Sequence, residues 1–132
     1  MADKLHTEWA PRILSIVRIV SALIFMAHGT AKIFSFPATE RGAPEFMSQM
    51  WIGGWLEIIG GILLVLGLFT RPTAFILSGM MAVAYWQFHA TQSIYPLQNG
   101  GDAAILYCFI FLYIAFAGGG PWSVDELRKR DG

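Results

Sequence analysis

The sequence predicts an all-α integral membrane protein, a four-helix bundle with both termini in the cytoplasm. Composition is the first reason: 55% of the 132 residues are hydrophobic and only 14% are charged, against about 25% charged residues in a typical soluble domain. The second reason is the presence of four apolar stretches long enough to cross a bilayer, which takes about 17 to 25 residues. The third is the uneven distribution of basic residues between the connecting segments.

The four predicted spans run roughly over residues 13–33, 51–69, 73–91 and 103–119. Together they leave no room for a second domain, so we expect residues 1–132 to form a single one. Pro11 suits the first turn of the first helix, where its missing N–H costs nothing. Because the first stretch is long and contains Arg18, we expect an uncleaved span and not a signal peptide.

The basic residues predict the orientation of the spans. Both termini share one side with most of the basic residues, namely Lys4, Arg12, Arg71, Arg128, Lys129 and Arg130, whereas Lys32 and Arg41 lie on the other side. The positive-inside rule therefore places both termini in the cytoplasm and segments 34–50 and 92–102 outside. The tail over residues 122–132 is expected to lie at the headgroups or in solvent. The nine basic and nine acidic residues cancel, which predicts no nucleic acid partner.

Ionisable side chains inside the spans demand an explanation, because each costs about 2.5 to 3.5 kcal/mol in hydrocarbon on insertion scales. At 100° per residue, the polar and small residues of the first span share a stripe about 100° wide. These residues are Arg18, Ser21, His28, Gly29 and Lys32. In the second span Glu57 lies within a seam of small residues that favours close helix packing. That seam contains Gly53, Gly60, Gly61 and Gly67.

These side chains converge on the outer half of the predicted bundle. We expect Glu57 to contact Lys32, His28 or both, since a nearby positive charge would keep a buried carboxylate ionised. His89 and Asp102 are expected to line the mouth of a cavity that opens to the outer face. The alternative is a buried ionic network that fixes the helix register without any chemistry.

Arg18 stands apart, about 8 Å from the inner end of its span at 1.5 Å per residue. Its side chain can extend toward cytoplasmic headgroups, or it can bind a carbonyl, a quinone oxygen or a carboxylate of a partner.

We do not expect a haem between His28 and His89, whose depths differ by about 5 Å. No Cys and His spacing predicts a metal site, and the single cysteine excludes an internal disulfide.

Several of these residues occur in motifs that resemble the DoxX family of small bacterial membrane proteins. The resemblance lies in Arg18 followed by His28-Gly29-x-x-Lys32, the run Gly54–Gly61, the segment Gly67–Arg71, and Gly118–Asp125. It covers nearly the whole chain and implies a four-helix, multi-pass protein of the bacterial inner membrane, often associated with quinone-linked oxidoreduction. Asp102 stands where the family commonly has Glu, and Val124 interrupts the usual Ser-Leu-Asp.

The leading hypothesis is therefore a quinone-facing or membrane-anchoring subunit of an oxidoreductase complex, at most an accessory subunit of the enzyme. Glu57, Lys32 and His28 would bind a quinone and donate its proton, and His89, Asp102 and Arg18 would add further contacts. No covalently bound cofactor is expected, and a membrane or peripheral redox protein would supply the electrons. A homo-oligomer is compatible with this hypothesis. The competing hypothesis is a non-enzymatic membrane scaffold, assembly factor or chaperone-like factor with a structural polar core.

Overall fold

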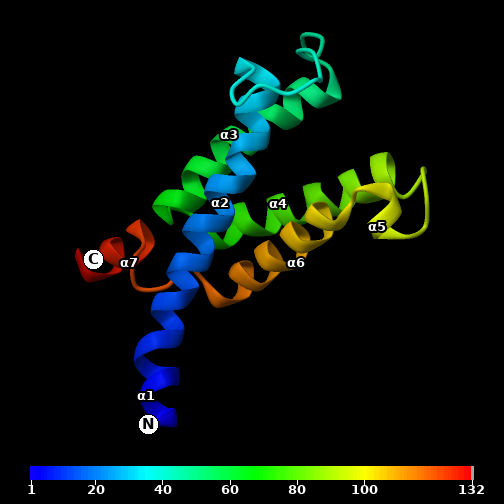
Figure 1. Cartoon of the computed structure of the whole chain (residues 1–132). Coiled ribbons are helices and arrows are strands. Elements are labelled where there is room, and N and C mark those ends of the chain that lie inside the picture. Colours follow the sequence, from blue (N-terminus) through cyan, green and yellow to red (C-terminus); the bar gives the residue numbers. More distant parts are fainter. Residues whose placement is uncertain (132) are drawn as a thin grey trace.

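The computed structural model describes residues 1–131, and all of its regular elements in this range are helices (Figure 1). The predicted all-α class is confirmed. In chain order the elements are α1 (Ala2–Lys4), the π-helical η1 (Leu5–Trp9), α2 (Ala10–Phe34), α3 (Gln49–Leu66), α4 (Thr70–Ala84), the π-helical η2 (Tyr85–His89), α5 (Pro96–Asn99), α6 (Asp102–Ala117) and α7 (Val124–Asp131).

Each predicted span falls on one long helical stretch, although the boundaries differ. The first begins earlier than predicted, because α1, η1 and α2 continue one another from Ala2 to Phe34. The third predicted span changes from α-helix to π-helix at Tyr85 and ends at His89. Among the described residues, two helices, Ala2–Phe34 and Gln49–Leu66, are long and apolar enough to cross a membrane, and the apolar helix Asp102–Ala117 is shorter.

The long helices form two antiparallel pairs, α2 with α3 and α4 with α6 (Figure 1). The two pairs meet near α7, where the α3–α4 turn and residues 118–123 lie, and we call this the closed end. At the other end the loops 35–48 and 90–101 lie apart, and we call this the open end (Figure 1). The molecule therefore has the shape of a wedge, whose two helix pairs diverge toward the open end (Figure 1).

Close packing within the wedge depends on a few glycines. A Cβ atom on Gly29 would lie 2.6 Å from the Gly54 carbonyl oxygen, so α2 and α3 cross in close contact there. Gly60 faces Leu77 and Gly61 faces Met26, as the predicted seam requires. Gly53 does not belong to that seam, because no atom lies within 4 Å of its Cβ position. Gly67 ends α3 with a φ of 70°, and a Cβ atom there would lie 2.4 Å from Ser123 Cβ and 3.0 Å from Arg18 Cζ.

Large apolar side chains cover the outward faces of the helices. On α6 the exposed fractions of Leu106, Phe109 and Phe116 are 62%, 64% and 74%. Exposed apolar residues recur along α2 as well, at Ile13, Ile16, Val17, Val20, Leu23 and Ile24. Apolar surface of this extent marks an interaction with a membrane or another protein.

Arg18 is completely buried at the closed end. Its Nε donates a hydrogen bond to the Leu64 carbonyl at 2.8 Å, and its Nη2 donates to the Trp122 carbonyl at 2.7 Å. Its Nη1 donates to the Gly119 carbonyl. The expected extension toward headgroups is therefore wrong, and the alternative of carbonyl binding is correct. Arg18 joins α2 to the end of α3 and to the segment before α7, where the helix does not continue and carbonyl groups can accept from a side chain.

The C-terminal tail also belongs to the closed end. Asp125 accepts hydrogen bonds from the backbone N–H groups of Phe69 and Thr70, both at 2.9 Å, and so caps the start of α4. The Asp125 N–H donates in turn to the Gly67 carbonyl at 2.9 Å. Arg71 donates to the Phe116 carbonyl at the end of α6. The tail is thus packed onto the α3–α4 turn instead of being only an interfacial or solvated segment.

Candidate ligand-binding cavity

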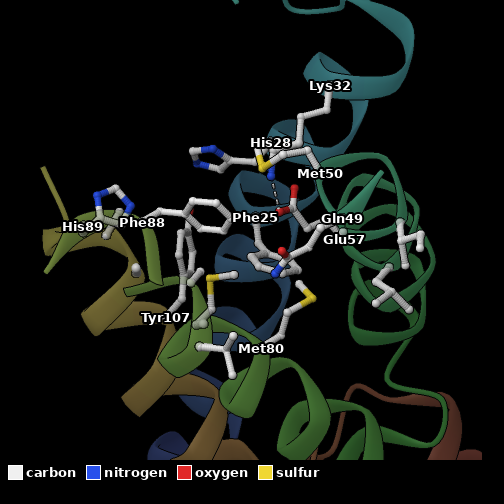
Figure 2. Close-up of a pocket in the computed structure, with 18 of the residues that line it drawn as sticks. Phe25, His28, Lys32, Gln49, Met50, Glu57, Met80, Phe88, His89 and Tyr107 are labelled. Atoms are coloured by element: carbon white, nitrogen blue, oxygen red, sulfur yellow. Dashed lines mark hydrogen bonds and ion pairs between the residues drawn. The ribbon is translucent and has the colours of Figure 1, made fainter. Parts of the chain in front are cut away.

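A cavity of about 860 Å³ lies between the two helix pairs toward the open end. This volume falls within the range of about 300 to 1,000 Å³ typical of small-molecule sites. Its walls are largely apolar and include Phe25 and Tyr107, with Met80, Met81 and Phe88 from the α4–η2 arm (Figure 2). A small number of polar side chains interrupt these walls.

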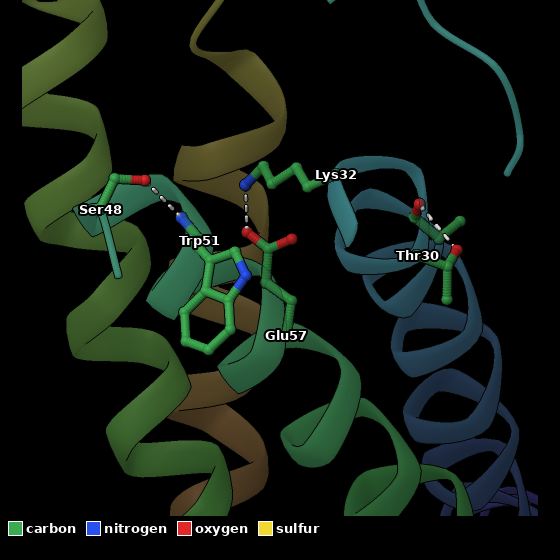
Figure 3. A network of polar contacts seen from close by, with 6 residues as sticks. Thr30, Lys32, Ser48, Trp51 and Glu57 are labelled. Carbon is green, nitrogen blue, oxygen red and sulfur yellow. Dashed lines mark hydrogen bonds and ion pairs between the residues drawn. The ribbon is translucent and has the colours of Figure 1, made fainter. Parts of the chain in front are cut away.

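The most deeply buried charged side chain among them is that of Glu57, which forms an ion pair with Lys32. Lys32 Nζ lies 2.6 Å from Glu57 Oε1, and their side chains are 22% and 5% exposed (Figure 3). The predicted contact between these residues is therefore present. The local fold explains it, because Ser48 caps the start of α3 and the glycine crossing at Gly29 brings Lys32 of α2 over Glu57.

Glu57 keeps one unused hydrogen-bonding position. Among residues 1–131, the buried Oε2 atom of Glu57 has no hydrogen-bond partner. Lys32 Nζ makes one hydrogen bond within the same residues, to Glu57 Oε1, although an ammonium group carries three donors. The pair therefore has one acceptor atom and further N–H donors available to a ligand head.

His28 lies one turn before Lys32 on α2 and also lines the cavity. Its ring points away from the ion pair (Figure 2) and packs edge-on against Tyr107, with ring centroids 6.1 Å apart. The sequence allowed Glu57 to contact Lys32, His28 or both. The structure has the Lys32 contact. His28 is an exposed residue of the cavity lining and does not take part in the ion pair.

The remaining predicted site residues divide between the cavity and other places. His89 lines the cavity, with its Nδ1 3.0 Å from the Asn99 carbonyl and its ring stacked on Tyr85. Asp102 is exposed at the first turn of α6 and is absent from the cavity lining, which corrects its predicted place at the mouth. An acidic residue is favoured there by the helix dipole. Arg18 lies at the closed end and contacts carbonyls, as described above.

Sequence reasoning missed a pair of amides at the open end. The side chains of Gln49 and Gln87 donate hydrogen bonds to each other at 2.7 and 3.1 Å, joining α3 to η2. Gln87 lies among the aromatic residues Tyr85, Trp86 and Phe88. The π-helical turn of η2 changes the register that a regular helix would give, and π-bulges are frequent at functional sites. Such a turn gives no signal in the residue pattern.

The arrangement can hold the polar head of a small ligand in an otherwise apolar space. Lys32 offers donors, Glu57 offers an acceptor, and His28 and His89 add two imidazoles at the cavity margin. Across residues 1–131, no group of three or more His, Cys, Asp or Glu side chains is placed to hold a metal ion.

Comparison with known proteins shows the family of the chain. Residues 13–90 match the DoxX family model, which is more than half of the chain. The chain belongs to the DoxX family. An uncharacterised protein of Haemophilus influenzae is 42% identical to it over 124 residues, covering 90% of this chain and 92% of the relative. No solved structure matches the chain.

Two further DoxX-like relatives are membrane proteins of Escherichia coli. Inner membrane protein YphA is 30% identical over 88% of this chain and 90% of its own length. Inner membrane protein YqjF is 29% identical over 87% of this chain and 91% of its own length. The chain is therefore a membrane protein of the DoxX family, which agrees with the apolar outward faces of its helices.

The motifs that carried the DoxX resemblance serve different parts of the structure. Gly67–Arg71 and Gly118–Asp125 together form the closed end, through the Asp125 cap and the Arg71 contact with α6. The His28-Gly29-x-x-Lys32 motif and Glu57 form the polar part of the cavity. The first group of motifs holds the closed end together, and the second group lines the cavity between the helix pairs.

Proposed function

We propose that this DoxX protein crosses the bacterial inner membrane with four helical spans and serves as a quinone-facing subunit of an oxidoreductase complex. The spans would be α2, α3, α4 continued by η2, and α6, with both termini and the closed end in the cytoplasm. The distribution of basic residues supports this orientation, because six of them fall on the side of the termini and the α3–α4 turn. The cavity then opens toward the outer leaflet.

The observation that carries the proposal is the half-satisfied ion pair in an apolar cavity. An ionisable pair placed at membrane depth is costly and marks a functional site by default. A quinone carbonyl would accept a hydrogen bond from Lys32, and a quinol hydroxyl would donate one to the free Glu57 oxygen. Complete reduction of a quinone takes up two electrons and two protons. The Lys32 ammonium would give one proton to the bound oxygen, and solvent water at the open end would supply the second proton to the other oxygen and restore the ammonium. A redox protein partner supplies the electrons.

Purification from the membrane tests this proposal. The protein is extracted in detergent with its partners, and quinone, flavin and haem are measured in the extract for the wild type and Glu57→Gln. We expect co-extracted quinone with the wild type and at least a tenfold loss with Glu57→Gln. Glu45→Gln, an exposed acid in the loop 35–48, serves as the matched control. Equal amounts of quinone with the wild type and with Glu57→Gln would reject the role of Glu57. Partner-supported quinone reduction that is unchanged in Glu57→Gln would reject it as well.

A scaffold or assembly role is the second candidate, and one observation favours it. Lys32 and Glu57 join α2 to α3 within one helix pair, so the ion pair also fixes the register of these helices. A colourless preparation that captures the same membrane or peripheral partner with the wild type and with Glu57→Gln would support this role. The same experiment therefore separates the two functions.

A further inference from the structure

The exposed residues that line the cavity fall into two groups with different chemistry. Polar residues gather at the open end, where His28, Arg41, Gln49 and Gln92 line the cavity and are exposed. Apolar residues line it along the facing sides of α3 and the α4–η2 arm. These are Ile52 and Leu56, both 43% exposed, together with Val83 at 56% and Phe88 at 39%.

The apolar group marks an opening on the side of the molecule. Residues that both line a cavity and reach the surface lie at its openings. On the opposite wall Phe25 and Tyr107 are only 1% and 9% exposed, and the exposed Ala103 lies in the first turn of α6, at the open end. The opening is bounded at the open end by the Gln49–Gln87 amide pair. Toward the closed end it is bounded by Gly60 against Leu77. Gln49 and Gly60 are eleven residues apart on α3, or about 16 Å along the helix.

The polar part of the cavity restricts what the head of a ligand can be. Lys32 and Glu57 neutralise each other, so an anionic head would meet the Glu57 charge and a cationic head the Lys32 charge. An uncharged head that both donates and accepts a hydrogen bond fits the free Glu57 oxygen and the remaining Lys32 donors. Leaving that buried oxygen unpaired is costly, which favours a ligand that donates to it.

We propose that the ligand is a chain-bearing amphiphile that enters from the bilayer through this side opening. Its small uncharged head binds at Lys32 and Glu57, and its chain remains in the opening beside Leu56 and Val83, in contact with lipid. This inference rests on the proposed function, which places α3 and α4 in the membrane. It narrows the substrate class to quinones with a long apolar chain and assigns their path between α3 and α4.

The test compares two benzoquinones with the same ring, one carrying a decyl chain and one carrying none. Binding to the purified full chain in lipid nanodiscs is followed by quenching of tryptophan fluorescence, with each probe expressed as its concentration in the membrane. Leu56→Trp and Val83→Trp each narrow the opening. Ile59→Trp, on an exposed position of α3 outside the cavity lining, is the matched control. Monodisperse elution and an unchanged melting temperature show that each variant is folded.

We expect Leu56→Trp and Val83→Trp to weaken binding of the decyl probe at least tenfold and to change binding of the chainless probe less than twofold. Ile59→Trp should change neither. Equal weakening of the two probes, or no weakening of either, would overturn the side path while leaving the quinone site in place. Failure of both probes to bind the wild type would overturn the proposed function as well. Tighter binding of decanoate than of the decyl benzoquinone would overturn the uncharged head.

Discussion

The two ends of this molecule differ in how their buried and partly buried charged groups are hydrogen-bonded. At the closed end each of the three Arg18 nitrogens donates to a backbone carbonyl, and both carboxylate oxygens of Asp125 accept from backbone amides. At the open end Glu57 uses one oxygen for Lys32, and its other oxygen is buried without a partner among residues 1–131. The cavity at the closed end, about 530 Å³, has many polar side chains in its lining, among them Thr70, Asp125 and Arg128.

This difference separates the charged residues that stabilise the fold from those that are available to bind a ligand. A buried charge whose hydrogen bonds are all made by the backbone stabilises the fold, and its removal leaves unpaired peptide groups. A buried charge with an unused position beside a cavity is available to a ligand. We therefore expect substitutions at the closed end to act on stability, and substitutions of the ion pair to act on binding.

Loss of Arg18 should have the largest effect. Arg18→Met keeps an unbranched apolar chain but removes the Arg18 donors from three carbonyls. The Leu64 carbonyl keeps the Gly67 N–H and the Gly119 carbonyl keeps the Ser15 hydroxyl, whereas the Trp122 carbonyl has no other donor among residues 1–131. We expect the free energy of unfolding to fall by about 3 to 5 kcal/mol, measured by circular dichroism during denaturation in detergent. Arg12→Met, which removes a cation–π contact with Trp9, should cost less than about 1 kcal/mol. Similar losses for the two variants would contradict the role of Arg18.

The helix crossing at Gly29 comes next. Gly29→Ala places a Cβ atom 2.6 Å from the Gly54 carbonyl oxygen and 2.9 Å from Glu57 Cβ, so α2 must move away from α3. We expect a loss of about 1 to 3 kcal/mol in the same denaturation measurement. Gly53→Ala is the control, because no atom lies within 4 Å of its added Cβ. If Gly29→Ala proved as stable as Gly53→Ala, the close crossing would be wrong.

The Asp125 cap predicts a pH-dependent contribution to stability. Partial burial acts to raise the pKa of Asp125, but hydrogen bonds from Thr70 and Phe69 and the charge of Arg128 outweigh it and lower the pKa. A lowered pKa stabilises the fold above the ordinary carboxyl pKa, and this stability is lost as the pH falls through the folded value. Asp125→Asn should cost about 1 kcal/mol at pH 7.

The difference between the wild type and Asp125→Asn should then shrink below about pH 4, near the ordinary pKa of an aspartate. Denaturation at a series of pH values measures it, and Asp3→Asn, in the exposed N-terminal turn, is the control. A difference that stayed constant down to pH 2 would show that the Asp125 charge does not stabilise the cap.

The smallest expected effect belongs to the amide pair at the open end. Gln49→Ala and Gln87→Ala remove two hydrogen bonds between exposed side chains, and such bonds contribute little because water replaces them. A double-mutant cycle should give a coupling free energy of about 0.5 to 1 kcal/mol. Additive losses would mean that the amide pair does not hold α3 to η2.

The sequence was sufficient to predict the helices and the central contact of the cavity. Apolar length located the ends of the long helices to within a few residues, since a bilayer-crossing helix needs a nearly continuous apolar run. The exception is the start of the first helical stretch, which lies at Ala2 and not near residue 13. Helical spacing placed Lys32 and His28 on one stripe and Glu57 in a glycine seam. Because the first and second helices pack antiparallel, Lys32 and Glu57 meet across the pair. Local periodicity and chain direction were enough for this contact.

Other features depend on contacts that no local pattern contains. The Arg18 acceptors Gly119 and Trp122 lie more than one hundred residues away in the sequence, within an irregular segment. Asp102 was expected at the cavity mouth from its depth alone, but the rotation of α6 turns Ala103 and Tyr107 to the cavity instead. The wedge follows from how two helix pairs meet, which depends on packing across the whole chain.

The most direct test replaces the ion pair with apolar residues of similar size. In Lys32→Met/Glu57→Leu both charges are removed together, so no unpaired charge remains buried, and such replacements are often neutral or stabilising. We predict a folded protein whose free energy of unfolding is within about 1 kcal/mol of the wild type, and at least tenfold weaker binding of the chainless benzoquinone. Unfolding comparable to that of Arg18→Met, or unchanged quinone binding, would contradict the account.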